Sequence, residues 1–350
     1  MNKNILFTLL FFITLIGCSD DINYPTIIDQ VPNLPDGYTY VPDDRFEQIL
    51  IDLGYDKTDS IPDDMVLTEN IQVIKALDID SAGIYKLDGI EDFSSLEFLS
   101  CSWNQLEKLD LSNNKALKKL VCKRNRIYGN NLKIDKNYNL TYLDCTNGKI
   151  ASLDLTEILD LDTLYCGENR ISSLDLSKNK KLRLLTCTNN MIPKLEVNQN
   201  KELLRMECYG NPMTELSLSN PKLQYLGCFE NNLKILDLSQ CPALLQVDCF
   251  MNELNTIYFA ENNNLRSLSA GYNNFESIDL SDCSRLLRLN LKINKLKTIN
   301  MRNGNNHRMK SFFVIKNPDL KCIQVDDVAW SIANWTDVDK TAIFSGDCSL

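Results

Sequence analysis

The sequence predicts a β-rich solenoid, a rod of stacked turns that carries two columns of short parallel strands. The first observation is a fixed period: eight cysteines recur at steps of 20 to 23 residues, namely Cys101, Cys122, Cys145, Cys166, Cys187, Cys208, Cys228 and Cys249. Two further steps of 21 residues reach Ala270 and Leu291, where other apolar residues take the place of cysteine. Self-similarity at a period of this length is typical of repeat architectures, in which each unit packs only on its neighbours.

The second observation is a pair of short apolar alternations in each unit, such as Leu99-x-Cys101 and Leu109-x-Leu111. Alternation over three residues, bounded by Asn and Ser, indicates a short half-buried strand, and the units show no helical period. Stacked units therefore place two columns of parallel strands on opposite sides of a narrow core of Leu and Cys.

The third observation is an asparagine three residues after the cysteine position. It occurs at Asn104, Asn125, Asn169, Asn190, Asn211, Asn231, Asn252, Asn273, Asn294 and Asn317. The chain turns at this point, and an inward amide can donate to and accept from backbone groups that lack ladder partners. We expect a structural asparagine ladder. The unit with Asn147-Gly148 breaks the rule, so its turn should differ locally.

Together these features give the unit LxxLxCxxNxLxxLDLSxN, whose near-copies cover residues 96–325. The pattern resembles bacterial leucine-rich repeats, in particular the 21-residue type called IRREKO. The resemblance implies a capped solenoid from a surface protein of a Bacteroidetes-like, flavobacterial type. It is specific for the fold and carries almost no information about a ligand.

The amino-terminal residues predict export and a lipid anchor. Residues 1–17 combine Lys3 with an apolar run too short to span a bilayer, which is typical of a signal peptide. The following Leu15-Ile16-Gly17-Cys18 looks like a lipobox, so we expect Cys18 to be acylated and to anchor the protein in the bacterial outer membrane, facing the exterior. The acidic residues after Cys18 resemble the surface-export signal of Bacteroidetes lipoproteins. The alternative is an ordinary signal peptide with an incidental cysteine.

The ends of the solenoid should be covered. Residues 18–42, rich in proline, suit an anchor and tether, and residues 43–95 should form an amino-terminal cap and a first rung. In that cap we expect a helix begun by Asp43 or Asp44 and ended by Gly54, with Phe46, Ile49, Leu50 and Leu53 on one apolar face. Residues 326–350 resemble the carboxy-terminal cap of the same family. That resemblance implies a disulfide between Cys322 and Cys348, with Trp330 and Trp335 packed over the last rung.

The cysteine column itself invites a disulfide or a metal site, and geometry argues against both. Neighbours in a parallel ladder lie about 4.8 Å apart with parallel side chains, whereas a disulfide requires Cβ atoms ~3.8 Å apart. Tetrahedral metal ligands must converge, and no histidine accompanies these cysteines. We expect buried thiols that act as small apolar groups. Cys241 and Cys283 share another repeat position and should be half-buried in turns.

The composition and motifs favour a binding protein over an enzyme. The chain has 37 Lys and Arg against 47 Asp and Glu, a net charge of −10, which disfavours nucleic acid as a partner. His307 is the single histidine, no nucleophile pairs with it, and the sequence has neither a phosphate-binding loop nor an HExxH motif. We therefore expect no catalytic residues, no metal and no cofactor. An outward acidic column recurs at Asp110, Asp154, Asp175, Glu196, Asp237 and Asp279. It should be solvated, the alternative being calcium binding or glycosidase chemistry.

A partner should contact the outward residues that vary from rung to rung beside the cysteines. The predicted binding residues are Tyr142, Tyr165, Arg205, Glu207, Tyr209, Tyr225, Phe229, Asp248, Phe250 and Tyr272. Exposed aromatic and charged residues of this kind mark contact surfaces. The sequence thus predicts a protein-recognition or adhesion module. A glycan-binding lipoprotein of a polysaccharide-uptake system is the alternative, and cross-rung aromatic stacking that only stabilises the sheet is the structural explanation of the same residues.

Overall fold

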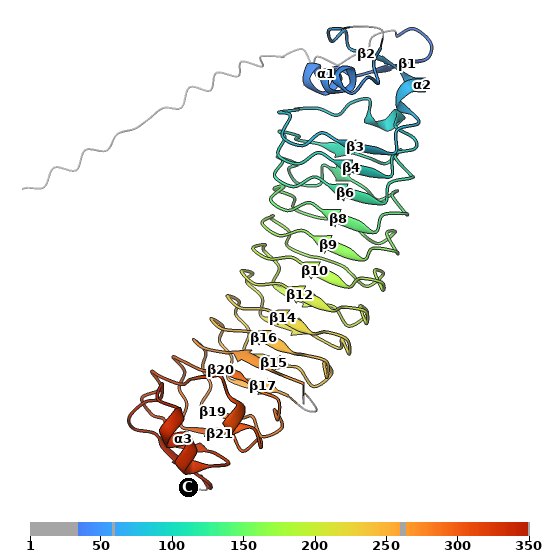
Figure 1. Cartoon of the computed structure of the whole chain (residues 1–350). Helices are drawn as coiled ribbons and strands as arrows, with labels where there is room; N and C mark the ends of the chain where they lie inside the picture. The colour runs from blue at the N-terminus through green and yellow to red at the C-terminus, as the bar shows by residue number, and fades with distance from the viewer. Residues whose placement is uncertain (1–33, 58–59, 260–263, 349–350) are drawn as a thin grey trace, which may run out of the picture. The chain divides into compact units, whose positions relative to one another are not determined.

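The computed structural model describes residues 34–57, 60–259 and 264–348, which form one compact unit built as a parallel β-solenoid (Figure 1). Residues 1–33 lie outside the described residues, and with them the predicted signal peptide and Cys18. Among the described residues, no helix is long and apolar enough to cross a lipid bilayer.

The first predicted strand column is a single parallel sheet of twelve strands, one from each successive rung. Its strands are β3 (Ala76–Asp78), β4 (Phe98–Ser100), β6 (Lys119–Val121), β8 (Tyr142–Asp144), β9 (Thr163–Tyr165), β10 (Leu184–Thr186), β12 (Arg205–Glu207), β14 (Tyr225–Gly227), β16 (Gln246–Asp248), β18 (Ser267–Ser269), β20 (Arg288–Asn290) and β22 (Ser311–Phe313). Equivalent repeat positions are in register, for example Leu185 with Met206 and Leu226 with Val247. The fixed period of the sequence therefore sets the register in which neighbouring strands of this sheet pair.

The second column is less regular than the sequence predicts, because it breaks into four small parallel sheets. They contain β5 (Leu109–Asp110) with β7 (Leu132–Lys133), β11 (Lys194–Glu196) with β13 (Glu215–Ser217), β15 (Ile235–Asp237) with β17 (Thr256–Tyr258), and β19 (Ser277–Asp279), β21 (Thr298–Asn300), β23 (Cys322–Gln324) and β24 (Ile343–Ser345). One break, between β13 and β15, coincides with the 20-residue unit between Cys208 and Cys228.

The core between the columns contains the repeated leucines and all eight cysteines of the ladder, each fully buried. These cysteines are free thiols, as predicted. Burial raises the pKa of the Cys187 and Cys228 thiols to about 12, so both remain protonated and unreactive at neutral pH. The prediction for Cys241 and Cys283 is wrong: both are free but fully buried.

The asparagine ladder is confirmed, and Asn190 shows how each member works. Its Nδ2 donates to the carbonyls of Cys166 and Cys187, at 3.0 and 3.2 Å, while its Oδ1 accepts from the N–H of Ile171 at 3.0 Å. Each amide thus joins its own rung to the preceding one through the backbone. In the exceptional unit Gly148 takes the ladder position, and its N–H donates to Oδ1 of Asn169.

A second asparagine ladder, which the sequence analysis did not predict, lies at the other turn of the rung. It consists of Asn114, Asn137, Asn179, Asn200 and Asn220, all fully buried. Asn200 is typical, since its Nδ2 donates to the carbonyls of Leu176 and Asn179, both at 2.9 Å. Cys241 follows Asn220 by 21 residues and continues this ladder, which explains its burial.

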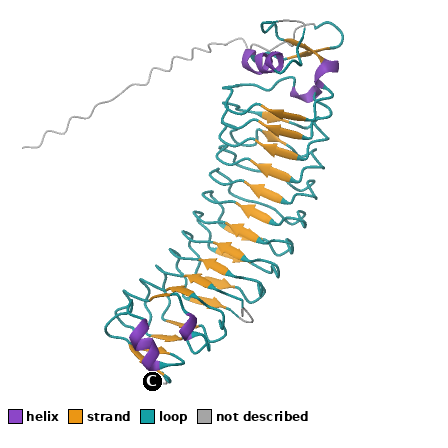
Figure 2. Ribbon diagram, in the orientation of Figure 1, coloured by secondary structure: helices purple, strands orange, loops and turns teal. Residues whose placement is uncertain are grey.

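Helices lie at the two ends of the described chain (Figure 2). The amino-terminal cap contains β1 (Tyr38–Tyr40), paired with β2 (Met65–Leu67), and α1 (Asp44–Asp52), α2 (Thr68–Ile71) and the 3₁₀ turn η1 (Ile90–Asp92). Strand β1 lies inside the range predicted as a tether, so ordered structure begins before residue 43. Asp43 caps α1, and Gly54 follows it with a positive φ of 75°. Phe46 and Leu50 are buried as predicted and Ile49 is partly buried against the core, whereas Leu53, which follows the last residue of α1, is 52% exposed.

The carboxy-terminal cap contains the 3₁₀ turn η2 (Asn306–Arg308) and α3 (Val328–Asn334). The Cys322–Cys348 disulfide is present, as the resemblance implied. Trp335 stacks on Phe312 of the last strand of the large sheet with ring centroids 4.0 Å apart, and Trp330 meets Trp335 edge-on. The two tryptophans therefore cover the end of the core, as predicted.

Candidate recognition surface

The outward face of the twelve-stranded sheet carries all ten predicted binding residues. Six lie in strands β8, β9, β12, β14 and β16, and the other four lie in the turns that follow β12, β14, β16 and β18. All ten side chains are at least partly accessible. The leucines and cysteines between them point into the core, because successive residues of a strand face opposite sides.

Three of these residues form a continuous aromatic stack across adjacent rungs. The rings of Tyr209 and Phe229 lie 4.2 Å apart and those of Phe229 and Phe250 4.5 Å apart, with interplanar angles of 11° and 8°. Cross-rung stacking, the structural explanation of the sequence pattern, is thus what these rings do. Both faces of Phe229 are covered by its neighbours, so the stack offers a partner its ring edges and the outer faces of its two end rings.

A polar network lies beside the aromatic stack. The guanidinium of Arg205 sits 3.9 Å from the ring centroid of Tyr225 and donates to Oε1 of Glu207. The Tyr225 hydroxyl donates to Asp248 at 3.1 Å, and Gln246 donates to the same carboxylate oxygen. These contacts fix the orientation of four charged or phenolic side chains in advance of binding, which lowers the entropy cost of using them.

Of the remaining three residues, Tyr272 lies beside Phe250 at the end of the stack, whereas Tyr142 and Tyr165 form a separate group. Their rings lie 5.9 Å apart, and Lys119 approaches Tyr142 with its Nζ 4.7 Å from the ring centroid. Strand β10, which carries neither an aromatic nor a charged residue, lies between this pair and the network around Arg205. With Tyr272 counted beside Phe250, the ten predicted residues therefore make two groups on one face.

Sequence reasoning missed a column of left-handed residues two positions after the cysteine position. Every rung has a positive φ there: Ser81, Trp103, Arg124, Asn147, Glu168, Asn189, Gly210, Glu230, Met251, Tyr272, Ile293 and Lys316. Gly and Asn adopt this conformation readily, whereas bulky side chains do so at a cost. Trp103, Met251 and Tyr272 are also 53%, 46% and 41% exposed. The side chains that adopt this unfavourable backbone conformation are therefore accessible to a partner. Asn147, Asn189 and Gly210 were the hints in the sequence.

The acidic column is exposed and solvated, and most of its members are engaged locally. The carboxylates of Asp110, Asp154 and Asp279 each accept from the N–H and hydroxyl of the Ser or Thr two residues later. Glu196 instead pairs with Lys194. The hydrogen bonds from Thr156 hold the pKa of Asp154 below its usual value. Local hydrogen bonding thus explains why this column recurs.

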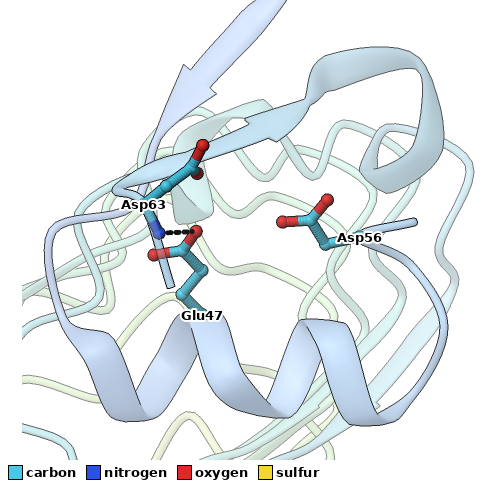
Figure 3. Close-up of side chains that lie close together, drawn as sticks. All are labelled: Glu47, Asp56 and Asp63. Carbon is cyan, nitrogen blue, oxygen red and sulfur yellow. Dashed lines mark hydrogen bonds between the residues drawn. The ribbon is translucent and has the colours of Figure 1, made fainter. Parts of the chain in front are cut away.

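The amino-terminal cap holds a separate group of carboxylates, Glu47, Asp56 and Asp63 (Figure 3). One carboxylate oxygen from each residue lies within 4.8 Å of those of the other two, which is close enough to hold a metal ion. Glu47 is fully buried and accepts the N–H groups of Asp63 and Asp64, both at 2.9 Å. Burial raises the pKa of Glu47 to about 7. Both of its oxygens are thus committed to holding the loop after α1, which is a structural role.

His307 is half-exposed, stacks on Trp330 with ring centroids 4.7 Å apart, and lies 3.3 Å from a carboxylate oxygen of Asp327. It belongs to the carboxy-terminal cap, where these contacts hold η2 against α3. Neither Ser nor Cys is among the partners that the structure gives to this side chain.

The described unit resembles solved structures of one fold. The functional domain of InlJ from Listeria monocytogenes, which includes a cysteine ladder, is 26% identical, with a TM-score of 0.69 over 88% of this chain and 70% of that one. The chain has the leucine-rich repeat fold. An internalin, inlF, from Listeria monocytogenes is 19% identical, with a TM-score of 0.59 over 88% and 97% of the two chains. A leucine-rich repeat protein of Leptospira interrogans is 18% identical, with a TM-score of 0.59 over 79% and 81%.

No family model and no curated protein matches the sequence. The leucine-rich repeat assignment therefore rests on the repeat and on the solved structures. A cysteine ladder is a feature that this chain has in common with the InlJ domain.

Proposed function

We propose that this chain is a lipid-anchored surface protein that recognises a protein partner through the outward face of its twelve-stranded sheet. The observation that carries the proposal is the pairing of the aromatic stack with the network of Arg205, Glu207, Tyr225 and Asp248. Partly exposed aromatics next to fixed charges are the composition of protein-binding hot spots. The structural likeness to internalins and other leucine-rich repeat proteins agrees with a recognition role.

The anchor in this proposal rests on the sequence alone, through the lipobox that ends at Cys18. Metabolic labelling with palmitate tests it. We expect the label on the wild-type protein and its loss in a Cys18→Ala variant, and label that survives this substitution refutes the anchor.

Glycan binding is the second candidate, and the aromatic stack makes it the weaker one. Sugar recognition by aromatic residues uses the flat face of a ring, and both faces of Phe229 are covered by other rings. Only the end faces of the stack remain for a pyranose. A glycan array probed with the purified protein tests this alternative directly.

The central experiment is capture from intact cells, compared between matched variants. The test variant carries Tyr209→Ala, Phe229→Ala and Phe250→Ala. The control carries Leu159→Ala, Ile235→Ala and Tyr258→Ala, which remove side chains that are 52–55% exposed and lie away from the twelve-stranded sheet. We expect the test variant to lose a protein that the wild type and the control both retain. Equal retention by all three, with circular dichroism showing them folded, contradicts the proposed surface.

A further inference from the structure

The aromatic stack ends at a glycine. Gly271 occupies the repeat position of Tyr209, Phe229 and Phe250 in the next rung, and Lys292 occupies it in the rung after that. A Cβ atom on Gly271 would lie 3.0 Å from the backbone oxygen of Lys292, 3.1 Å from Cγ of Lys292 and 3.3 Å from Oδ1 of Asn290. The outer face of Phe250 therefore adjoins a position that has no side chain of its own and toward which the Lys292 stem leans. A hollow of about 310 Å³ opens there, lined by Phe250, Met251, Ser269, Tyr272, Asn290 and Lys292. We call it the Gly271 notch.

The walls of the Gly271 notch are built at an energetic cost. Met251 and Tyr272 both have a φ of 55°, in the left-handed region that disfavours large side chains. Asn189 and Gly210 occupy the same repeat position in two preceding rungs, and their residue types adopt this conformation readily. Strained residues that are also exposed point to a role in binding rather than in folding. Here two of them flank one hollow.

The size of the notch matches one flat ring. Rungs of a parallel sheet are about 4.8 Å apart, so the backbones at Phe250 and Lys292 are separated by about 10 Å along the column, with the Lys292 stem leaning toward Gly271. The existing rings stack at 4.2 and 4.5 Å, and two such intervals span this separation. A ring placed over Gly271 would extend the stack by one member, between the face of Phe250 and the methylene stem of Lys292, with that flexible side chain displaced outward from Gly271. The thioether of Met251 and the ring of Tyr272 would then contact its edges.

On the Lys292 side, the surroundings of the Gly271 notch are basic, although the chain as a whole is acidic. The outward charged residues on β18, β20 and β22 and in the segments beside them are Arg266, Arg288, Lys292, Lys310 and Lys316. The stretches 265–273, 286–294 and 309–317 contain no Asp or Glu. On the Lys292 side, charge complementarity therefore favours an acidic ligand. The rung that supplies Phe250 and Met251 carries Asp248, in register with Ser269, but this carboxylate already accepts hydrogen bonds from Tyr225 and Gln246.

We propose that the Gly271 notch receives one aromatic side chain of the partner protein, from a segment whose flanking carboxylates meet the basic residues on the Lys292 side. This inference rests on the proposed function and names the chemistry of the partner. An aromatic ring fits the distance at which the rings of the aromatic stack lie from one another, and the carboxylates would pair with the positive charges of Arg288 and Lys292.

Two synthetic peptides test the proposal without knowledge of the natural partner: acetyl-Glu-Asp-Phe-Asp-Glu-amide and the same peptide with Leu in place of Phe. The readout is methyl NMR of protein labelled on its eight methionines, with the Met251 resonance assigned by Met251→Leu. We expect the Phe peptide to shift the Met251 methyl upfield in a saturable way, through the ring current, and the Leu peptide to have at least tenfold lower affinity. Equal effects of both peptides, no saturable shift, or a shift caused by xylotriose but by neither peptide overturns the proposal.

A pair of substitutions separates binding from folding. Tyr272→Asn removes one wall of the notch but places a residue suited to a positive φ. Trp103→Asn makes the same change at the same repeat position, φ 57°, far along the sheet. Both variants should keep or raise their melting temperature, while only Tyr272→Asn weakens the Phe peptide, by fivefold or more. Equal affinity in both variants refutes the notch.

The peptide titration and the capture experiment together distinguish a failure of this inference from a failure of the proposed function. If neither peptide binds, yet the Tyr209, Phe229 and Phe250 triple variant still loses the cell-surface protein, the notch is wrong and the recognition face stands. If the Phe peptide binds to the Gly271 notch but that triple variant and the wild type capture the same proteins, the proposed function fails at the aromatic stack instead.

Discussion

The two asparagine ladders should differ in how much they stabilise the fold, and the pair Asn190→Ala and Asn200→Ala measures that difference. Asn190 uses its whole amide: Oδ1 accepts from the Ile171 N–H, and Nδ2 donates to the Cys166 and Cys187 carbonyls. Asn200 uses only its donor, because its buried Oδ1 has no hydrogen-bond partner among the described residues. The same substitution therefore removes different sets of interactions.

The magnitudes follow from counting buried backbone groups. Asn190→Ala leaves one N–H and three carbonyls, those of Cys166, Cys187 and Thr188, without the amide, and at about 1 kcal/mol for each group the loss is about 3–4 kcal/mol. Asn200→Ala leaves only two carbonyls without the amide, and it removes an unsatisfied buried oxygen whose desolvation cost about 1–2 kcal/mol. We expect a net loss of only about 1 kcal/mol at residue 200.

Urea unfolding followed by circular dichroism measures both losses, with Asn113→Ala as the control because Asn113 is exposed beside a member of the second ladder. The control should change the unfolding free energy by less than about 0.5 kcal/mol. Equal losses for Asn190→Ala and Asn200→Ala, or a larger loss at residue 200, would show that the acceptor side of the amide does not matter and would refute the reasoning.

Three further predictions concern backbone strain, pH and the carboxy-terminal cap. Met251→Asn should raise the unfolding free energy by about 1 kcal/mol and the reciprocal Asn189→Met should lower it by a similar amount, because both positions have a positive φ; urea midpoints that move in the same direction contradict this. The raised pKa of Glu47, about 7, means that folding favours its protonated form, so the stability it contributes is complete below about pH 4.5 and is lost as the pH rises through 7. Thermal melts should fall between pH 5 and 8, and Glu47→Gln should flatten that slope; the lowered pKa values of Asp110 and Asp154 act only below about pH 4. Replacing Cys322 and Cys348 by alanine should cost about 3 kcal/mol for a sequence separation of 26 residues, seen first as faster hydrogen exchange in β23 and β24, and unchanged exchange there would show that the tryptophans hold the cap unaided.

Much of this fold could be predicted because each rung repeats the same physical problem. The spacing of the cysteines set the register, and the asparagine three residues later is the residue type that a buried turn needs. Cys241 and Cys283 were placed wrongly because two cysteines outside the main column gave no sign of the buried ladder that Cys241 continues, which Asn220 and Asn200 define only when the rungs are superposed. Leu53 obeyed the helical spacing but falls at the helix end, where the chain leaves the core.

The recognition surface was harder to predict than the core. Sequence position showed that Tyr209, Phe229 and Phe250 recur on successive rungs, but not that their rings lie face to face, which depends on side-chain torsions. The column of residues with a positive φ could not be predicted, because it contains Trp103, Met251 and Tyr272, whose residue types seldom adopt a positive φ. The Gly271 notch follows from both features together, since it needs the end of the stack and the adjacent strained residues.

Site-specific photo-crosslinking on intact cells tests the recognition face most directly. A photoreactive amino acid would replace Met251, beside the aromatic stack, or Tyr258, which is 52% exposed in the second strand column. The account predicts a discrete protein adduct from position 251 that the Tyr209, Phe229 and Phe250 triple alanine background abolishes, and no such adduct from position 258. The same adduct from both positions, or one that persists in the triple alanine background, would contradict it.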